Sequence, residues 1–235
     1  MKYSLIDMIA VVSDIHSNLE AFTKVLREIE KKKCSIVFNA GDTAGYYTRP
    51  DECVNILRKR KIVSVMGNHD NALLQKDFET LGPVASESLK WQRKRLSKTN
   101  LKFLSSFPKI LDREIRERKI TMVHGSPSDP LGDYVFPWTP EHVFEEFLEK
   151  TGAEILIMGH SHVPFVKKIS DKLVLNPGSV GQPRDGNPKA SFALADTQKM
   201  KATIKRVEYD VFKACDDVAD SGLPVFLAER LLQGI

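Results

Sequence analysis

The sequence predicts an α/β fold in which two mixed β-sheets pack against each other as a β-sandwich and helices flank them. Over residues 8–69, short apolar runs alternate with helical patterns, as expected for strands that crossover helices connect. From about residue 109 onward the pattern becomes rich in strands. Many strands with helices outside them are typical of two packed sheets.

The first third of the chain alternates strands with helices. Its predicted strands are Met8–Val12, Ser35–Asn39 and Ile62–Met66. The first helix follows a capping-box pattern, in which Ser17 is the N-cap and Glu20 reaches back to it. Apolar residues then recur at helical spacing, and Asp51–Arg60 is the second predicted helix.

The middle of the chain predicts a helical insertion at about residues 71–107. Pro83–Ser97 and Asn100–Ser106 both have helical patterns and separate the first three strands from the strand-rich half. The chain contains no internal repeat and no low-complexity linker. We therefore expect a single domain over residues 1–235 that contains this insertion.

The second half of the chain is mostly strands. They are predicted at Lys109–Ile115, Lys119–Val123, Glu154–Met158, Phe165–Ile169, Leu173–Leu175, Ala190–Ala195 and Ala202–Tyr209. One helix, Pro140–Lys150, interrupts them, with Thr139 as its predicted N-cap and Pro140 at its first position. The tail, Val211–Leu232, is predicted to be helical.

Composition excludes several classes of protein. The net charge of +4 is too small to indicate a nucleic-acid partner. The sequence contains no run of about 18 apolar residues, so no transmembrane helix is predicted. Met1–Ile9 lacks the apolar region of a secretory signal. The three cysteines are dispersed, which suits a reducing compartment. We expect a cytoplasmic protein with no membrane partner.

Histidine placement indicates a functional site. Five of the six histidines fall at the ends of predicted strands: His16, His69, His124, His160 and His162. Ligand sites of open α/β sheets collect outside the carboxyl ends of strands. Asp14 and His16 are two residues apart, as are His160 and His162. If these segments are extended, each pair points to one side.

The residues at these strand ends predict a binuclear metal site. The candidate ligands are Asp14, His16, Asp42, Asn68, His124, His160 and His162. Mixed nitrogen and oxygen ligands suit divalent Mn, Fe, Zn, Co or Ni better than Ca or Mg, and we favour Mn. Seven ligands are too many for one tetrahedral ion. Two ions that share Asp42 would use all of them, at a separation of about 3.5–4 Å.

These motifs resemble, in order and spacing, the calcineurin-like metallophosphoesterases over roughly Ile9–Asp196. The matching motifs are Asp14-x-His16, Gly41-Asp42, Gly67-Asn68-His69-Asp70, His124-Gly125 and Gly159-His160-Ser161-His162. The resemblance implies a β-sandwich fold and two metal sites. It assigns Asp14, His16, Asp42 and His162 to one ion, and Asp42, Asn68, His124 and His160 to the other. His69 would contact the phosphate or protonate the leaving oxygen.

The sequence departs from one motif of this family. Many of its phosphoprotein phosphatases continue Gly-Asp-x-x-Asp-Arg-Gly, whereas residues 41–47 read Gly-Asp-Thr-Ala-Gly-Tyr-Tyr. The second Asp and the phosphate-binding Arg are missing. The stretch Asn176–Asp185 instead resembles small prokaryotic phosphodiesterases and dinucleoside polyphosphate hydrolases. Arg184 is the candidate for the missing phosphate contact, because its planar fork suits phosphate oxygens.

The predicted function is hydrolysis of a phosphodiester or nucleotide polyphosphate, with a diadenosine polyphosphate as the leading candidate. A hydroxide that bridges the two metals would attack the phosphorus atom. The expected partner is thus a small phosphorylated substrate, in particular a nucleotide. The alternatives are a phosphomonoesterase or protein phosphatase, and a non-catalytic scaffold of the same fold, as in the retromer subunit.

Some nearby residues leave two interpretations open. Asp70 either orients His69 or caps the following helix. The loop aromatics could stack on a substrate base, although ordinary burial is the favoured interpretation. These aromatics are Tyr46, Tyr47, Tyr134, Phe136 and Trp138. The segment Ser126–Trp138 is predicted to face the substrate, because loops on a rigid scaffold often carry recognition. His142 matches no motif and is predicted to lie on the surface.

Overall fold

The computed structural model describes residues 8–235, and two five-stranded mixed sheets form the centre of this part. The first sheet has the order β10 (Lys201–Val207), β9 (Ala190–Asp196), β1 (Met8–Val12), β2 (Ile36–Asn39) and β3 (Val63–Ser64). The second has the order β4 (Ile110–Ile115), β5 (Arg118–Val123), β6 (Ile155–Ile157), β8 (Lys172–Asn176) and β7 (Phe165–Ile169). The predicted β-sandwich is confirmed.

Each sheet has a parallel centre and antiparallel edges. Strands β1, β2 and β3 are parallel, and β9 returns antiparallel to β1. In the second sheet β5, β6 and β8 are parallel, while β4 and β7 pair antiparallel at the two edges. Parallel neighbours end on the same edge of a sheet, so this arrangement gathers the loops that follow them.

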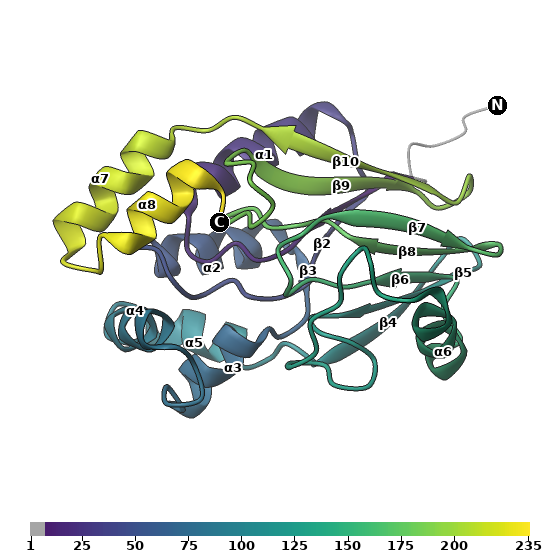
Figure 1. The fold of residues 1–235 in the computed structure, drawn as a ribbon, viewed down its shortest axis with the longest axis horizontal. Coiled ribbons are helices and arrows are strands. Elements are labelled where there is room, and N and C mark those ends of the chain that lie inside the picture. The colour runs from purple at the N-terminus through teal and green to yellow at the C-terminus, as the bar shows by residue number, and fades with distance from the viewer. Residues whose placement is uncertain (1–7) are drawn as a thin grey trace.

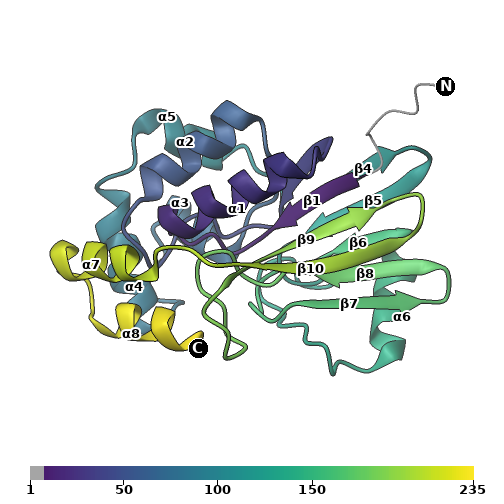
Figure 2. The ribbon, with the colours of Figure 1, turned by 90° about the horizontal axis from the view of Figure 1, so that it is seen from above.

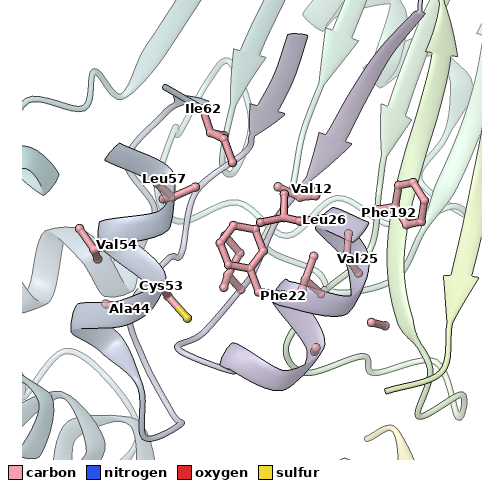
Figure 3. Close-up of a cluster of buried hydrophobic side chains, with 14 of the residues drawn as sticks. Val12, Phe22, Val25, Leu26, Ala44, Cys53, Val54, Leu57, Ile62 and Phe192 are labelled. Carbon is pink, nitrogen blue, oxygen red and sulfur yellow. The ribbon is translucent and has the colours of Figure 1, made fainter. Parts of the chain in front are cut away.

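Alternation along β1 builds two apolar layers. Ile9 and Val11 belong to the cluster between the two sheets, whereas Ala10 and Val12 belong to the cluster under the helices. Successive side chains of a strand point to opposite faces, so a strand that is covered on both faces is apolar throughout. Figure 3 shows Val12 beside Phe22 and Leu26 on the helix side of the sheet.

Helices cover the outer face of each sheet. Helices α1 (Leu19–Lys31) and α2 (Pro50–Arg60) cover the first sheet, and α6 (Glu141–Thr151) covers the second through Phe144 and Phe147. Figure 1 shows α6 at the opposite end of the molecule from α7 (Val211–Ser221) and α8 (Phe226–Gln233). In Figure 2 the strands separate α1 and α2 from α6.

The helical insertion starts earlier than predicted. Three helices lie between β3 and β4: α3 (Asn68–Gln75), α4 (Pro83–Arg93) and α5 (Lys98–Leu104). Helix α3 has no counterpart among the predicted helices. It begins at Asn68, with three residues between it and the end of the short strand β3, so Asn68 and His69 belong to its first turn. The predicted strand Ile62–Met66 is correspondingly reduced to Val63–Ser64.

Three predicted helix boundaries are wrong. Asn18, not Ser17, is the N-cap of α1, because the Asn18 side chain accepts the amide hydrogen of Ala21 at 3.1 Å. Pro140, not Thr139, is the N-cap of α6. The tail forms two helices, since α7 ends at Gly222 in the left-handed conformation and α8 starts only after Pro224. Proline restricts the residue before it and ends helices.

No helix in the described part of the chain has the length and apolar character that crossing a bilayer requires. The prediction that Met1–Ile9 is no secretory signal falls largely on residues 1–7, which lie outside the described residues.

Candidate metal centre

The predicted ligands meet where the parallel strands of both sheets end. Asp14 and His16 follow β1, Asp42 follows β2, and Asn68 begins α3 just after β3. From the second sheet, His124 follows β5. His160 and His162 follow β6. All but Asn68 are buried. The site therefore straddles the seam between the two sheets.

The backbone at the site is not extended, so the argument from two-residue spacing is wrong. Asp14, His16, Asp42, His160 and His162 have positive φ angles of 53°, 48°, 53°, 67° and 59°. Such angles cost about 1–3 kcal/mol each for residues other than glycine and persist where the surroundings enforce them. Here cross-loop hydrogen bonds do so: the amides of Asp14 and His16 donate to the carbonyls of Gly41 and Asp42, both at 3.0 Å.

Main-chain carbonyls fix the protons of three histidines. The Nδ1 atoms of His16 and His124 lie 3.0 Å and 2.7 Å from the carbonyl oxygens of Ala44 and Ala40. The Nδ1 atom of His162 contacts the carbonyl oxygen of Gln182 in the same way. A carbonyl only accepts, so each Nδ1 carries the hydrogen and the Nε2 lone pair of a neutral ring is free. Metal-ligating histidines are oriented by the same kind of contact.

The free lone pairs face other acceptors. His162 Nε2 lies 3.1 Å from His16 Nε2 and 3.2 Å from Asp14 Oδ1. Asp14 Oδ1 is buried without a hydrogen-bond partner among the described residues. Acceptor atoms held this close without a shared hydrogen repel one another unless a cation lies between them. This donor set fits a divalent metal.

A second group of acceptors lies beside the first. His124 Nε2 is 3.0 Å from Asn68 Oδ1 and 3.1 Å from His160 Nδ1. His160 Nε2 is buried and has no hydrogen-bond partner in residues 8–235. Asp42, His124 and His160 together are close enough to hold one ion, as are Asp14, His16 and His162.

Asp42 lies between the two groups. Its Oδ2 atom is 3.7 Å from His16 Nε2 and 3.4 Å from His124 Nε2. Its other oxygen accepts the main-chain hydrogen of His69 at 2.9 Å, which fixes the carboxylate plane. The structure thus brings all seven predicted ligands together, with Asp42 where a bridging carboxylate is expected.

The charges of the site favour metal ligation. Burial lowers the pKa of His16 well below its usual value and that of His160 to about 3, so both rings are neutral. Burial alone would raise the pKa of Asp42, but the neighbouring histidines outweigh it and hold this pKa well below its usual range. Metal ligands must be deprotonated histidines and ionised carboxylates, and His16, His160 and Asp42 meet that condition. Burial lowers the pKa of His124, but Asp42 outweighs burial and raises this pKa to about 9, so a metal at His124 would replace a proton.

His69 lies at the start of α3 beside these ligands. Its Nε2 atom is 4.0 Å from Asp42 Oδ2, and its ring packs 4.8 Å from the ring of His16. Asp70 does not orient it, because His69 Nδ1 has no hydrogen-bond partner among the described residues. The Asp70 carboxylate instead accepts the amide hydrogens of Thr43 and Ala44 at 3.2 Å and 2.9 Å and that of Gly67 at 3.3 Å. Asp70 therefore caps the helix to which it belongs and holds the Asp42 loop.

Three residues at the site were missed or misjudged by sequence reasoning. Tyr46, which stands at the position of the missing family Arg, packs its ring 4.7 Å from that of His69. Its hydroxyl accepts a hydrogen bond from Arg184 at 3.0 Å, so the predicted phosphate contact does reach the site. Gln182 links Arg184 to the metal centre, because its side chain accepts from Arg184 at 2.9 Å and its carbonyl contacts His162. Arg230 also approaches Tyr46, and no motif pointed to it.

The loop Ser126–Trp138 reaches the other side of the site. The Tyr134 ring lies 3.9 Å from that of His160 and is 54% exposed. Phe136 and Trp138 continue outward as a stacked pair with ring centroids 4.8 Å apart. A cleft of about 390 Å³ is lined by Asn68, His160 and Tyr134 together with residues of the α3–α4 connection. The favoured interpretation, ordinary burial, holds for Tyr46 and is wrong for Tyr134.

Comparison with known proteins agrees with this geometry. The model of the calcineurin-like phosphoesterase superfamily domain matches residues 8–200. An uncharacterised protein of Methanocaldococcus jannaschii is 39% identical over 97% of this chain and 98% of its own length. A metallophosphoesterase from Sphaerobacter thermophilus has 30% identity and a TM-score of 0.83, covering 98% of this chain and 100% of that chain. A hypothetical protein from Pyrococcus horikoshii, 24% identical, shares the fold with a TM-score of 0.90 over 97% and 98% of the two chains.

Proposed function

The chain belongs to the calcineurin-like phosphoesterase superfamily, and we propose that it hydrolyses phosphodiesters or nucleotide polyphosphates with two divalent metal ions. The observation that carries this proposal is the convergence of buried imidazole nitrogens and carboxylate oxygens on Asp42. A scaffold that acts only by binding has no use for such a set of mutually facing acceptors.

The proposed ligand assignment follows the two groups on either side of Asp42. Asp14, His16, Asp42 and His162 would hold one ion, and Asp42, Asn68, His124 and His160 the other, with Mn favoured. When bound, such ions supply an activated water near neutral pH and neutralise phosphate charge. The chain itself would supply His69, to contact the phosphate or protonate the leaving oxygen. Arg184 would stabilise negative charge that develops in the transition state.

The surroundings of the site support a nucleotide substrate. Tyr134 is half exposed beside His160, and Trp138 is 72% exposed at the end of the same loop. Aromatic rings with free faces can stack on a nucleobase. Tyr46 and Tyr47 are buried, so this role falls to the loop Ser126–Trp138. A diadenosine polyphosphate remains the leading candidate.

The protein phosphatase alternative is less favoured by the residues beside His69. Gly45 and Tyr46 stand where that branch of the family has its second Asp and its Arg. The Nδ1 atom of His69 is buried without a hydrogen-bond partner among residues 8–235.

A cytoplasmic location is also proposed, and the three free cysteines support it.

A substrate screen with added Mn²⁺ tests the proposal. Purified protein is given bis-p-nitrophenyl phosphate, p-nitrophenyl phosphate, diadenosine tetraphosphate and a phosphoserine peptide. We expect the diester and the dinucleotide to be cleaved with higher kcat/KM than the two monoesters. His69→Ala should lower kcat about a hundredfold or more, in the range of a lost general acid or phosphate contact.

The control is His142→Ala, which removes an exposed histidine of α6 and should leave kcat unchanged. Metal content of each variant, measured by mass spectrometry, separates a lost ligand from a lost contact. Preference for the phosphoserine peptide would contradict the substrate class. A protein that stays inert with Mn²⁺, Zn²⁺ and Ni²⁺ would contradict the enzyme proposal itself.

A further inference from the structure

Two arginines from distant parts of the chain converge on Tyr46. The Cζ atoms of Arg184 and Arg230 lie 5.7 Å and 5.9 Å from the centroid of the Tyr46 ring. Arg184 belongs to the loop after β8, and Arg230 to helix α8. A main-chain hydrogen bond of 2.9 Å from Gly186 to Gly234 ties this loop to the end of α8. The convergence is therefore built into the fold.

Both guanidinium groups lie near the Tyr46 ring, and in residues 8–235 neither forms an ion pair with an acidic side chain. Within residues 8–235, Arg184 donates to Gln182 and Tyr46, and Arg230 donates to the main-chain oxygen of Ile235. By contrast, Arg49 and Arg118 each pair with a glutamate. Burial, and then the charge of Arg184, lower the pKa of Arg230. Like charges held near one another in a partly buried place favour a bound anion.

This pair borders the metal centre. Tyr46 packs its ring 4.6 Å from that of His16 and 4.7 Å from that of His69, and its hydroxyl points to Arg184. Tyr134 contacts His160, which belongs to the other group of ligands. The arginines and the exposed aromatic loop thus adjoin different ligand groups of the candidate site.

Arg230 lies in a part of the chain that the family match does not cover. The match ends at residue 200, whereas α8 runs from Phe226 to Gln233. Leu227 and Leu231 anchor α8 in an apolar cluster that includes Tyr46 and Tyr47. Helix α8 therefore does more than cover apolar surface, because it positions the Arg230 guanidinium at the edge of the site.

We propose that Arg184, Arg230 and the Tyr46 hydroxyl form a second anion subsite, which binds a phosphate adjacent to the one that is hydrolysed. This inference rests on the proposed function and narrows it. The substrate would contain at least two linked phosphates, as in nucleotide polyphosphates, rather than an isolated diester. Guanidinium forks bind phosphate oxygens through paired, charge-assisted hydrogen bonds, and two of them suit a group with more than one charge.

The test compares substrates with one and with several phosphates. With Mn²⁺ present, kcat/KM is measured for diadenosine tetraphosphate and for bis-p-nitrophenyl phosphate in wild type, Arg230→Gln and Arg230→Lys. We expect Arg230→Gln to lower the ratio of kcat/KM for diadenosine tetraphosphate to kcat/KM for bis-p-nitrophenyl phosphate by about tenfold or more. Arg230→Lys, which keeps a point charge but loses the fork, should fall between. Glu229→Gln, on the neighbouring exposed residue of α8, is the matched control and should keep the wild-type ratio.

Binding provides a readout that does not depend on turnover. Calorimetric titration of Mn²⁺-loaded protein with pyrophosphate and with orthophosphate should give a larger loss of affinity for pyrophosphate in Arg230→Gln. An equal proportional loss for both substrates, or no loss for either, would overturn the second subsite while leaving the phosphoesterase proposal intact. A wild-type protein that cleaves neither substrate would instead overturn the proposed function.

Discussion

Gly45 lies between two histidine rings of the metal centre. A Cβ atom at this position would lie 2.5 Å from His69 Nδ1 and 2.7 Å from His16 Nδ1, and the φ angle is +110°. A side chain here must therefore displace one of the two rings and strain the backbone. Since a ligand displaced by about 1 Å loses much of its effect, we expect Gly45→Ala to lower kcat/KM about a hundredfold.

Gly82 offers the matched control for this substitution. A Cβ atom there meets nothing within 4 Å, so Gly82→Ala should leave kcat/KM within about twofold of wild type. Steady-state kinetics on bis-p-nitrophenyl phosphate measure both variants. Equal activities of the two variants would mean that the site tolerates a displaced histidine ring, contrary to the packing described.

The residue types of the site were predictable, but their orientation was not. Polar residues directly after apolar strands identified Asp14, Asp42 and His124 from local pattern alone. The carbonyl contacts that fix the histidine protons depend on how separate loops meet, and no spacing encodes them. Arg230 could not be predicted for the same reason, because it reaches the site from a helix and lies 46 residues after Arg184 in the sequence.

Among the elements, Asn18 joins α1 to the loop that carries Arg184. Its side-chain oxygen caps the helix, while its amide donates to the carbonyl of Gly181 at 2.9 Å. Replacing an N-cap costs typically about 1 kcal/mol, and a lost buried hydrogen bond adds about 1 kcal/mol. We expect Asn18→Ala to lower the free energy of unfolding by about 2 kcal/mol, as measured by urea denaturation.

Ser17, the N-cap that the capping-box pattern predicts, provides the comparison. Its hydroxyl makes only a 3.5 Å contact with the carbonyl of Thr43, so Ser17→Ala should cost less than about 1 kcal/mol. If Ser17→Ala proved the more destabilising change, the assignment of the cap to Asn18 would be wrong.

The elements that the sequence predicted well are those with a complete local signal. Met8–Val12 and Phe165–Ile169 were predicted to the residue, and the other strands to within one or two residues at each end. Helix α3 was missed because its first turn, Asn68-His69-Asp70, is polar and only three residues separate it from the end of β3. The main-chain hydrogen of His69 in this turn is accepted by the distant Asp42 carboxylate, a contact that a local pattern cannot reveal.

At the scale of the whole molecule, the order of the strands depends on long-range pairing. Strands β9 and β10 return from the end of the chain to pair beside β1. The sequence predicts strands and two layers, yet nothing local assigns a strand to a sheet. The consequence for function is that the two sheets each contribute one part of the metal centre: Asp14 and Asp42 from the first, His124 and His160 from the second.

Metal binding should therefore stabilise the whole fold, because the ions would connect the two sheets. A ligand at a hundred times its Kd adds about 2.7 kcal/mol to the free energy of unfolding. For a chain of this size, each kcal/mol raises Tm by roughly 2–4 °C, so Mn²⁺ should raise Tm by roughly 5–11 °C over protein treated with a chelator. Calorimetry in the presence and absence of Mn²⁺ measures this shift.

The Tm shift should be much smaller in Asp42→Asn, which alters the residue between the two groups of ligands. It should equal the wild-type shift in Asp171→Asn, which alters an exposed carboxylate of the β7–β8 turn. Protons compete with metals for imidazole nitrogens, so at a fixed Mn²⁺ concentration the shift should also shrink as the pH falls toward 5. A Tm shift that Asp42→Asn leaves intact would mean that Mn²⁺ binds elsewhere and that the seam between the two sheets is not the metal site.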